Sequence, residues 1–281
     1  MSGGVNRSNR SIRQHYGHGS LLESILDALD AAGKDPDNLE IDDLAAVDEF
    51  HIRGREATRD MAAALGLRAG QRVLDAGCGL GGAARRLAVE YGCRVTGVDL
   101  NPEYCSVAAA FASRLALSGR LDYAAADATR LPFADQSFDV VWTQHSSMNI
   151  RDKHRLYREL HRVLRPGGRI AISDVVQGSG GGVLYPTPWA NRAEMSFLVT
   201  ASQLEHVLGE AGFEVDDRHD ATEAGARWFE RFAGRRASGA YPLGIHLLFG
   251  ESFAEMAANQ VRNLVERRIA LAQFIGHRPE T

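Results

Sequence analysis

Residues Val73–Gly82 read VLDAGCGLGG, an apolar run that ends near a carboxylate and is followed by four glycines within six residues. A glycine turn after a short apolar run is typical of the first strand-to-helix connection of an open parallel sheet, where ligands bind outside the carboxyl ends of the strands. Glycine tolerates positive φ and has no side chain, so the backbone can turn sharply and approach a ligand. The stretch therefore predicts both a fold class and the place of a ligand site.

From Arg72 onward, short β-branched runs alternate with longer helical patterns. The expected strands are residues 72–77, 94–100, 121–127, 138–144 and 168–176, and the expected helices between them are 82–91, 102–117 and 152–164. Strands that alternate with helices form a parallel sheet that is covered on both faces. We predict an α/β fold with a doubly wound, mostly parallel sheet.

Two segments are expected to add to this core. Residues 1–65 carry helical patterns at 21–29 and 47–65 and are predicted to form a helical N-terminal cap, while residues 66–281 hold the sheet domain. A Gly/Pro-rich interval at about 177–199 precedes a helix at 200–211 and a strand at 213–218. We expect this interval to be an inserted lid, because long loops in compact domains are usually functional.

The tail is expected to complete the domain with further helices and one strand. The pattern predicts a helix at 222–234, a turn at Ser238-Gly239 and a long helix from Ile245 to Arg268. The last apolar run, IALAQFIGH, is interpreted as an edge strand, so that a C-terminal helix and an edge strand occupy about 245–277.

Composition narrows the classes of partner. A net charge of -4 gives no electrostatic basis for binding nucleic acid or anionic lipid. No apolar run approaches the roughly 20 residues of a membrane span, and the N-terminus lacks the apolar centre of a secretory signal, so we expect a cytoplasmic protein. Cys78, Cys93 and Cys105 include no CxxC pair and are interpreted as reduced, structural thiols, with no metal site expected.

Two acidic residues indicate the kind of ligand. Asp99 ends the second expected strand about 20 residues after the glycines, where a carboxylate can accept hydrogen bonds from both hydroxyls of a ribose. Asp75 lies at the mouth of the turn, where a pyrophosphate would be repelled but a cationic ligand would be attracted. The residues thus favour a cationic nucleoside over a dinucleotide, and a dehydrogenase is the alternative that Asp75 weakens.

These motifs resemble those of class I S-adenosylmethionine-dependent methyltransferases. VLDAGCGLGG resembles their first motif, VTGVDLNPEY their ribose strand, ADATRLPFADQSFDVVWTQHSSMNI their adenine and active-site segments, and RVLRPGGRIAISD their fifth-strand motif. The resemblance implies a Rossmann-like domain with S-adenosylmethionine as methyl donor and S-adenosylhomocysteine as product. It implies the following cofactor-binding residues: Asp75, Gly77, Cys78, Gly79, Asp99, Leu100, Asp127, Ala128, Gln144 and His145.

A narrower resemblance concerns the methyl acceptor. DEFHIRGREAT, SSMNIRDK and LYPTPWA resemble segments of the methyltransferases that act on sarcosine and dimethylglycine. A quaternary ammonium product would be bound by aromatic faces, and an acceptor carboxylate by a bidentate guanidinium, for which Arg53 is the first choice and Arg192 the second. The expected acceptor-binding residues are Phe50, His51, Arg53, Asn149, Tyr185 and Trp189, with His145, Arg53 and Trp189 expected to take part in catalysis.

Several of these residues also have a structural interpretation. Arg53 could pair with neighbouring acids on a helix, Trp142 could belong to the core, and Asn149 could cap the helix that starts near Asp152. The two histidines, His51 and His145, could be satisfied polar side chains. The Arg85-Arg86 pair is expected on a helix surface.

The sequence thus predicts an enzyme that transfers a methyl group from S-adenosylmethionine to a small metabolite, with the nitrogen of an amine or amino acid as the expected acceptor. Transfer to oxygen or carbon is the alternative within the same chemistry, and it would require a positioned base, for which His145 is the best candidate. A cofactor-binding module without turnover is the alternative of another class. A homodimer and a monomer both stay open.

Overall fold

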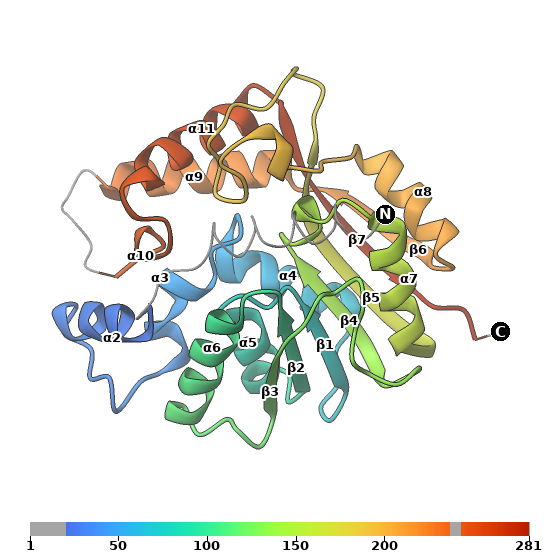
Figure 1. Ribbon diagram of the computed structural model, residues 1–281, viewed down its shortest axis with the longest axis horizontal. Helices are drawn as coiled ribbons and strands as arrows, with labels where there is room; N and C mark the ends of the chain where they lie inside the picture. Colours follow the sequence, from blue (N-terminus) through green and yellow to red (C-terminus); the bar gives the residue numbers. More distant parts are fainter. Residues whose placement is uncertain (1–20, 237–242, 281) are drawn as a thin grey trace.

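The computed structural model of the chain describes residues 21–236 and 243–280. Figure 1 shows a twisted sheet with helices on both faces. The strand order is β3-β2-β1-β4-β5-β7-β6. The strands are β1 Arg72–Ala76, β2 Arg94–Asp99, β3 Leu121–Ala125, β4 Phe138–Gln144, β5 Leu164–Gln177, β6 Glu214–Asp220 and β7 Ile269–His277.

Strands β1 to β5 run parallel, and β7 is antiparallel to both of its neighbours, β5 and β6. The strand order reverses between β1 and β4, which is the position where open sheets of this kind bind ligands. The predicted α/β class with a doubly wound, mostly parallel sheet is confirmed. The carboxyl ends of β1, β2 and β4 therefore meet at one edge of the sheet.

Helices cover both faces of the sheet and form the additions at its edge, and 3₁₀ turns lie between some of them. The helices are α2 Leu21–Ala31, α3 Ala45–Asp48, α4 Gly54–Leu65, α5 Gly82–Glu90, α6 Pro102–Arg114, α7 Lys153–Val163, α8 Ala201–Glu210, α9 Thr222–Arg236, α10 His246–Phe249 and α11 Phe253–Val265. The 3₁₀ turns are η1 Ile41–Asp43, η2 Ser147–Asn149, η3 Ala193–Met195 and η4 Gly250–Ser252.

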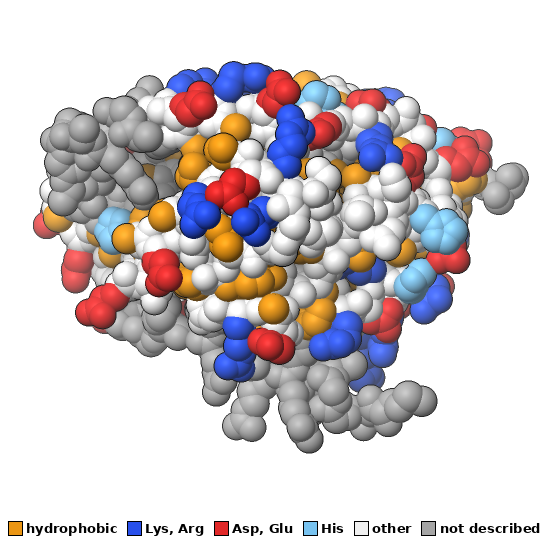
Figure 2. Space-filling model, turned by 90° about the horizontal axis from the view of Figure 1, so that it is seen from above, with side chains coloured by type: hydrophobic (Ala, Val, Ile, Leu, Met, Phe, Trp, Pro, Cys, Tyr) orange, Lys and Arg blue, Asp and Glu red, His pale blue; other side chains and the backbone are white. Residues whose placement is uncertain are grey.

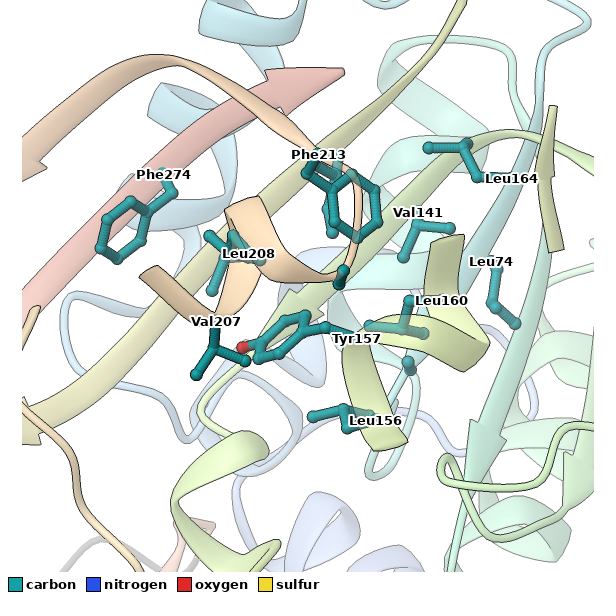
Figure 3. Close-up of a cluster of buried hydrophobic side chains, with 14 of the residues drawn as sticks. Leu74, Val141, Leu156, Tyr157, Leu160, Leu164, Val207, Leu208, Phe213 and Phe274 are labelled. Atoms are coloured by element: carbon teal, nitrogen blue, oxygen red, sulfur yellow. The ribbon is translucent and has the colours of Figure 1, made fainter. Parts of the chain in front are cut away.

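The core has two layers because neighbouring residues of a strand point to opposite faces of the sheet. Leu74 and Val141 pack on one face against α7 and α8, where Tyr157 and Leu208 lie among the side chains drawn in Figure 3. On the other face, Val73 and its neighbours pack against α4 and α5. Burying each large apolar side chain contributes on the order of 1.5–3 kcal/mol, so both layers hold the strand ends in fixed positions.

The N-terminal cap departs from the prediction in one place. The single helical region expected at 47–65 is wrong, since α3 ends at Asp48 and α4 begins at Gly54. Arg53 has φ of 73°, in the left-handed region, and the backbone turns there. The break turns residues 49–52 away from a helical path and toward the carboxyl ends of the strands.

The C-terminal region differs from the prediction in two places. The long helix expected from Ile245 is interrupted at Gly250, whose φ of 58° is one that glycine adopts readily. The strand expected at the edge, β7, instead lies between β5 and β6. Its apolar residues are buried on both faces, whereas the strand at that edge is the polar β6. The predicted turn at Ser238-Gly239 lies outside the described residues.

The surface seen in Figure 2 carries basic and acidic side chains side by side. Over α9 and α11 these charges form short-range pairs, such as Arg262 with Glu266 and Arg227 with Glu223. Within residues 21–236 and 243–280, none of the helices combines the length and the hydropathy that crossing a membrane requires.

Candidate functional site

A cavity of about 330 Å³ lies at the carboxyl ends of β1, β2 and β4. Segments far apart in the chain form its wall: the glycine turn, the ends of the strands, the cap, the lid and the C-terminal helices. Fourteen of the residues expected at the site line it. They are Phe50, His51, Asp75, Gly77, Cys78, Gly79, Asp99, Leu100, Asp127, Ala128, Gln144, His145, Asn149 and Trp189.

The glycine turn is packed against the protein itself. Gly77 has φ of 86°, and its N–H donates to the carbonyl of Val98 over 2.8 Å. A side chain at Gly77 would collide with the Cβ of Ser146, and one at Gly79 would lie 2.9 Å from the Phe50 ring. The room left by these glycines is therefore used by the loop after β4 and by the cap, which both reach the turn.

Asp99 is held at the end of β2 by backbone donors. The N–H of Gly79 donates to one carboxylate oxygen over 3.0 Å, and the N–H of Asn101 donates to the other over 2.8 Å. Each oxygen keeps a further lone pair that can accept from a ligand. The carboxylate is thus fixed in orientation before any ligand binds.

Asp75 is the more unusual acid of the two. Its side chain is 2% exposed, and Oδ2 has no hydrogen-bond partner among the described residues. Burial, with Asp99 as a second cause, raises the pKa of Asp75 to about 7. An uncompensated buried carboxylate in a cavity wall fits a cationic ligand, because a positive charge would supply the interaction that the protein does not.

Two histidines face the cavity between the glycine turn and the lid. The ring centroids of His51 and His145 are 6.0 Å apart. Loss of hydration lowers the pKa of His51 to about 4 and that of His145 to about 3, in the latter case with His51 as a second cause. Both rings are therefore neutral at pH 7, and each keeps one ring nitrogen without a proton.

A chain of hydrogen bonds joins the cap to the end of β4. His51 Nε2 lies 2.9 Å from the carbonyl of Gly54 and 3.2 Å from Thr58 Oγ1. Thr58 Oγ1 and Trp142 Nε1 both donate to Gln144 Oε1, over 3.3 and 2.9 Å. Trp142 is fully buried, so its interpretation as a core residue is confirmed.

The buried side chains of Asp174 and Lys153 hold the loop after β4 by hydrogen bonds to its backbone. Asp174 accepts from the N–H of Ser147 over 3.0 Å. Lys153 Nζ donates to the carbonyls of Ser147 and Ile150 over 2.7 and 3.0 Å. Loss of hydration lowers the pKa of Lys153 to about 8. These contacts hold His145 and Asn149 in place within the cavity wall.

The lid is packed into the protein through Trp189, which is 1% exposed. Its Nε1 donates to Ser196 Oγ over 3.0 Å, and Asn149 Nδ2 donates to its carbonyl over 2.6 Å. Asn149 does not cap the following helix, since that role belongs to Asp152, which accepts from the N–H of Arg155. The segment expected to be a lid therefore forms part of the cavity wall, through Pro188 and Trp189.

Two expected acceptor residues do not line the cavity. Arg53 donates to Asp60 Oδ2 over 2.5 Å and lies in a separate surface depression beside Glu56 and Arg231. This geometry agrees with its pairing interpretation. Tyr185 packs against the buried cluster that includes Trp189 and is not part of the cavity wall.

The prediction that Arg85 and Arg86 lie on a helix surface is wrong. The two side chains are only 1% and 2% exposed. Arg85 Nη2 lies 2.5 Å from Asp48 Oδ2, and Arg86 Nη2 lies 2.5 Å from Glu49 Oε1. Two adjacent acids, Asp48 and Glu49, and two adjacent arginines were the only sign in the sequence that these residues could pair. These buried pairs attach the cap to α5 beside the cavity.

The other missed residues give no signal of their own in the sequence. Tyr104, Phe249 and Gln260 line the cavity and come from α6, α10 and α11. Arg151 and Arg155 also line it, but both are exposed, with Arg155 donating to the carbonyl of Thr129 and Arg151 stacked over the Phe197 ring. Within the described ranges, no three metal-ligating side chains cluster.

Comparison with known proteins relates this chain to methyltransferases. Residues 74–172 match the methyltransferase domain family. The chain is 32% identical over 209 residues to 27-O-demethylrifamycin SV methyltransferase of Amycolatopsis mediterranei (strain S699), an alignment that covers 69% of this chain and 73% of that protein. Three curated relatives are matched over 66%, 62% and 73% of their length, so the chain spans about two thirds of these proteins.

Solved structures share the architecture over nearly the whole chain. The [4+2]-cyclase SpnF is 25% identical, with a TM-score of 0.67, 98% of this chain covered and 97% of that one. Phosphoethanolamine N-methyltransferase 2 of Haemonchus contortus, solved with phosphomonomethylethanolamine and S-adenosylhomocysteine, is 21% identical with a TM-score of 0.71. That match covers 95% of this chain and 60% of that one, and at this identity it indicates the fold alone.

Proposed function

The chain belongs to the class I S-adenosylmethionine-dependent methyltransferases, and from this premise we propose that it methylates a hydroxyl oxygen of a small metabolite. The observation that carries the proposal is the pair of neutral histidines, His51 and His145, facing the cavity between the glycine turn and the lid. A hydroxyl must lose its proton as it attacks the methyl group, and a neutral imidazole can accept that proton.

The cofactor is proposed to occupy the end of the cavity formed by β1, β2 and the segment after β3. Asp99 would accept from the ribose, with Leu100 against the adenine and Asp127 and Ala128 at its amino edge. Support comes from the shared cavity wall and from the buried carboxylate of Asp75, which lacks a partner among the described residues. When bound, the cofactor supplies an electrophilic methyl group on a positively charged sulfur.

The remaining work of catalysis is proposed to be alignment and proton removal. The Asp174 and Lys153 contacts hold the loop that carries His145, and the lid and the cap keep water from the cavity. Correct alignment of two reactants can supply on the order of 7–11 kcal/mol of barrier reduction. A positioned base adds roughly 10²–10⁴-fold. His145 is proposed as that base, and Trp189 as part of the wall that orients the acceptor.

An acceptor carboxylate finds little support in this cavity. The two arginines that line it are exposed, with Arg155 donating to the carbonyl of Thr129 and Arg151 stacked over the Phe197 ring, and Arg53 lies elsewhere. An amine acceptor without a carboxylate stays as a second candidate, because Phe50, Trp189 and Phe249 offer aromatic faces to an ammonium product. Of the nitrogen acceptors expected from the sequence, we therefore keep amines without a carboxylate and no longer propose amino acids.

Labelled S-adenosylmethionine and a panel of 4-ethylphenol, phenethylamine, dimethylglycine and phosphoethanolamine would test the proposal. We expect transfer to the phenol oxygen. Transfer to nitrogen alone would favour the second candidate. If calorimetry shows binding of S-adenosylhomocysteine but no acceptor is methylated, the module without turnover gains support, and absence of cofactor binding would overturn the proposal altogether.

A further inference from the structure

Gln260 is the residue from which we draw a further inference. It lies on α11, is 7% exposed and lines the cavity. Its side-chain amide makes no hydrogen bond to the described residues, although a primary amide carries two donor hydrogens and an acceptor oxygen. The amide is not among the fully buried groups that lack a partner, so it can be reached from the cavity and is available to a ligand.

The helix that carries Gln260 is held firmly against the lid. Asn263 is fully buried, and its amide both accepts from the N–H of Leu184 and donates to the carbonyl of Leu184, over 2.8 Å each. Asn259 Nδ2 donates to the carbonyl of Pro186 over 3.0 Å. Two of the three amides in this part of α11 are thus used for docking the lid, and Gln260 is the one left for the cavity.

The surroundings of Gln260 define the chemistry of its partner. The lid and C-terminal part of the cavity wall contains Pro188, Trp189 and Phe249. No arginine or lysine from α10, α11 or the described lid lines this cavity. The two arginines of the cavity wall, Arg151 and Arg155, come from the segment after β4 and are exposed, so they offer an anion beside Gln260 no buried counter-charge. A neutral carbonyl or hydroxyl could bond to the amide at a modest cost in hydration.

We propose that Gln260 determines acceptor specificity by hydrogen bonding a neutral carbonyl or hydroxyl that the acceptor carries in addition to the methylated atom. This inference rests on the proposed function and extends it from a reaction to a substrate class: an uncharged, mainly apolar molecule with at least two oxygen functions. The amide acts through binding, and it takes no part in proton transfer.

Two phenols of similar size provide the test. 4-Hydroxyacetophenone carries a carbonyl opposite its hydroxyl, and 4-ethylphenol lacks it. Dissociation constants for both are measured by calorimetry on the S-adenosylhomocysteine complex, so the result does not depend on turnover. We expect the wild-type protein to prefer the ketone by roughly 3- to 10-fold, the range of one neutral hydrogen bond.

The Gln260→Met variant keeps the length of the side chain and removes the amide, so the preference should fall to about one while 4-ethylphenol binds as before. Gln260→Glu, which offers only acceptor oxygens, should discriminate against the ketone. Glu255→Met is the control on the same helix, at an exposed position outside the cavity wall, and should retain the wild-type preference. An unchanged affinity ratio in Gln260→Met would overturn the inference, as would failure of both phenols to bind.

These outcomes separate the inference from the proposed function. Binding with the expected ratio but without methylation would contradict hydroxyl transfer and leave the role of Gln260 intact. Methylation of both phenols at equal kcat/KM, unaltered by Gln260→Met, would support hydroxyl transfer and contradict the role of Gln260. An unchanged affinity for S-adenosylhomocysteine in each variant shows that the cofactor end is undisturbed.

Discussion

The end of the cavity where we propose that the cofactor binds and the end where we propose that the acceptor binds are built in different ways. At the cofactor end, the strand ends and turns that line the cavity come from one stretch of chain between Asp75 and Thr129, which Phe50 of the cap contacts at Gly79. Asp99 is held there by backbone N–H groups. At the acceptor end, the wall is assembled from the cap, the loop after β4, the lid and α11. There the positions are set by side-chain bonds between distant segments, such as Asn149 to the carbonyl of Trp189.

This difference explains how one fold can serve many acceptors. The cofactor end follows from strand order and a local turn, which tolerate little change. The acceptor end depends on attached segments whose sequence can vary without disturbing the sheet. Substitutions that detach those segments should therefore leave the cofactor end intact, and the following predictions are ordered by the size of the expected effect.

The largest effect is expected where the cap is attached to the sheet domain. Asp48→Ala leaves the buried guanidinium of Arg85 without its carboxylate, which should lower the free energy of unfolding by about 3–5 kcal/mol. Asp37→Ala removes an ion pair of the same cap whose carboxylate is 91% exposed, and should cost about 1 kcal/mol or less. Urea unfolding of both variants measures the difference, and equal losses would refute the anchoring role of the buried pair.

The second effect concerns His145, the proposed base at the acceptor end. His145 has φ of 49°, a conformation that asparagine tolerates, so His145→Asn should fold while losing the imidazole. We expect kcat to fall roughly 100-fold with little change in the affinity for S-adenosylhomocysteine. A loss of cofactor affinity that matches the loss of rate would place His145 at the cofactor end instead.

The pH dependence gives an independent check on this residue. Because its pKa is lowered to about 3, His145 stays neutral when pH falls from 8 to 5, and its protonation should produce no decline in kcat/KM near pH 6.5. An uncharged phenol such as 4-ethylphenol is the suitable acceptor, since an amine would add its own titration. A titration at 6.5 that disappears in His145→Asn would show that the ring is hydrated in solution.

The contrast between the two ends also explains which residues could be predicted. Asp75, Gly77 and Asp99 lie in contiguous motifs whose spacing places them at adjacent strand ends, so local sequence was sufficient. Gln260 lies in an amphipathic helix where only its three-dimensional neighbours distinguish it from a surface glutamine. Arg53 failed to enter the cavity because a single residue with positive φ turned the chain, which helical periodicity does not reveal.

Burial of charge was the other property that the pattern could not show. Arg85 and Arg86 stand in a helix whose apolar residues alone predict a buried face, and a pair of arginines ordinarily marks the opposite face. The carboxylates that accompany them into the interior come from a segment 37 residues earlier in the chain. Likewise, the apolar run of β7 predicted a strand correctly but not its insertion between β5 and β6.

A smaller effect is expected at the cofactor end, where Asp75 should respond to pH. The pKa of its carboxyl is raised to about 7, and a cationic ligand selects the ionised form, so affinity for S-adenosylmethionine should increase as pH rises through 7. Asp75→Asn should bind about tenfold more weakly at pH 8, a difference of about 1.4 kcal/mol, and should lose the pH dependence between 6 and 8. Calorimetry at several pH values measures both, and a parallel profile in the variant would exclude Asp75 as the titrating group.

The smallest effect is expected for Arg53, where sequence and structure lead to opposite results. If its guanidinium bound an acceptor carboxylate, Arg53→Ala would raise the Michaelis constant for dimethylglycine by roughly tenfold or more, because bidentate charge-assisted pairs are strong. The side chain instead pairs with Asp60, which is 57% exposed, outside the cavity. We therefore expect Michaelis constants for dimethylglycine or 4-ethylphenol, whichever is methylated, to change by less than about twofold, and stability by about 1 kcal/mol or less. A selective rise for the carboxylate alone would mean that the segment after α3 turns inward when the acceptor binds, so that the acceptor end is completed only in the complex.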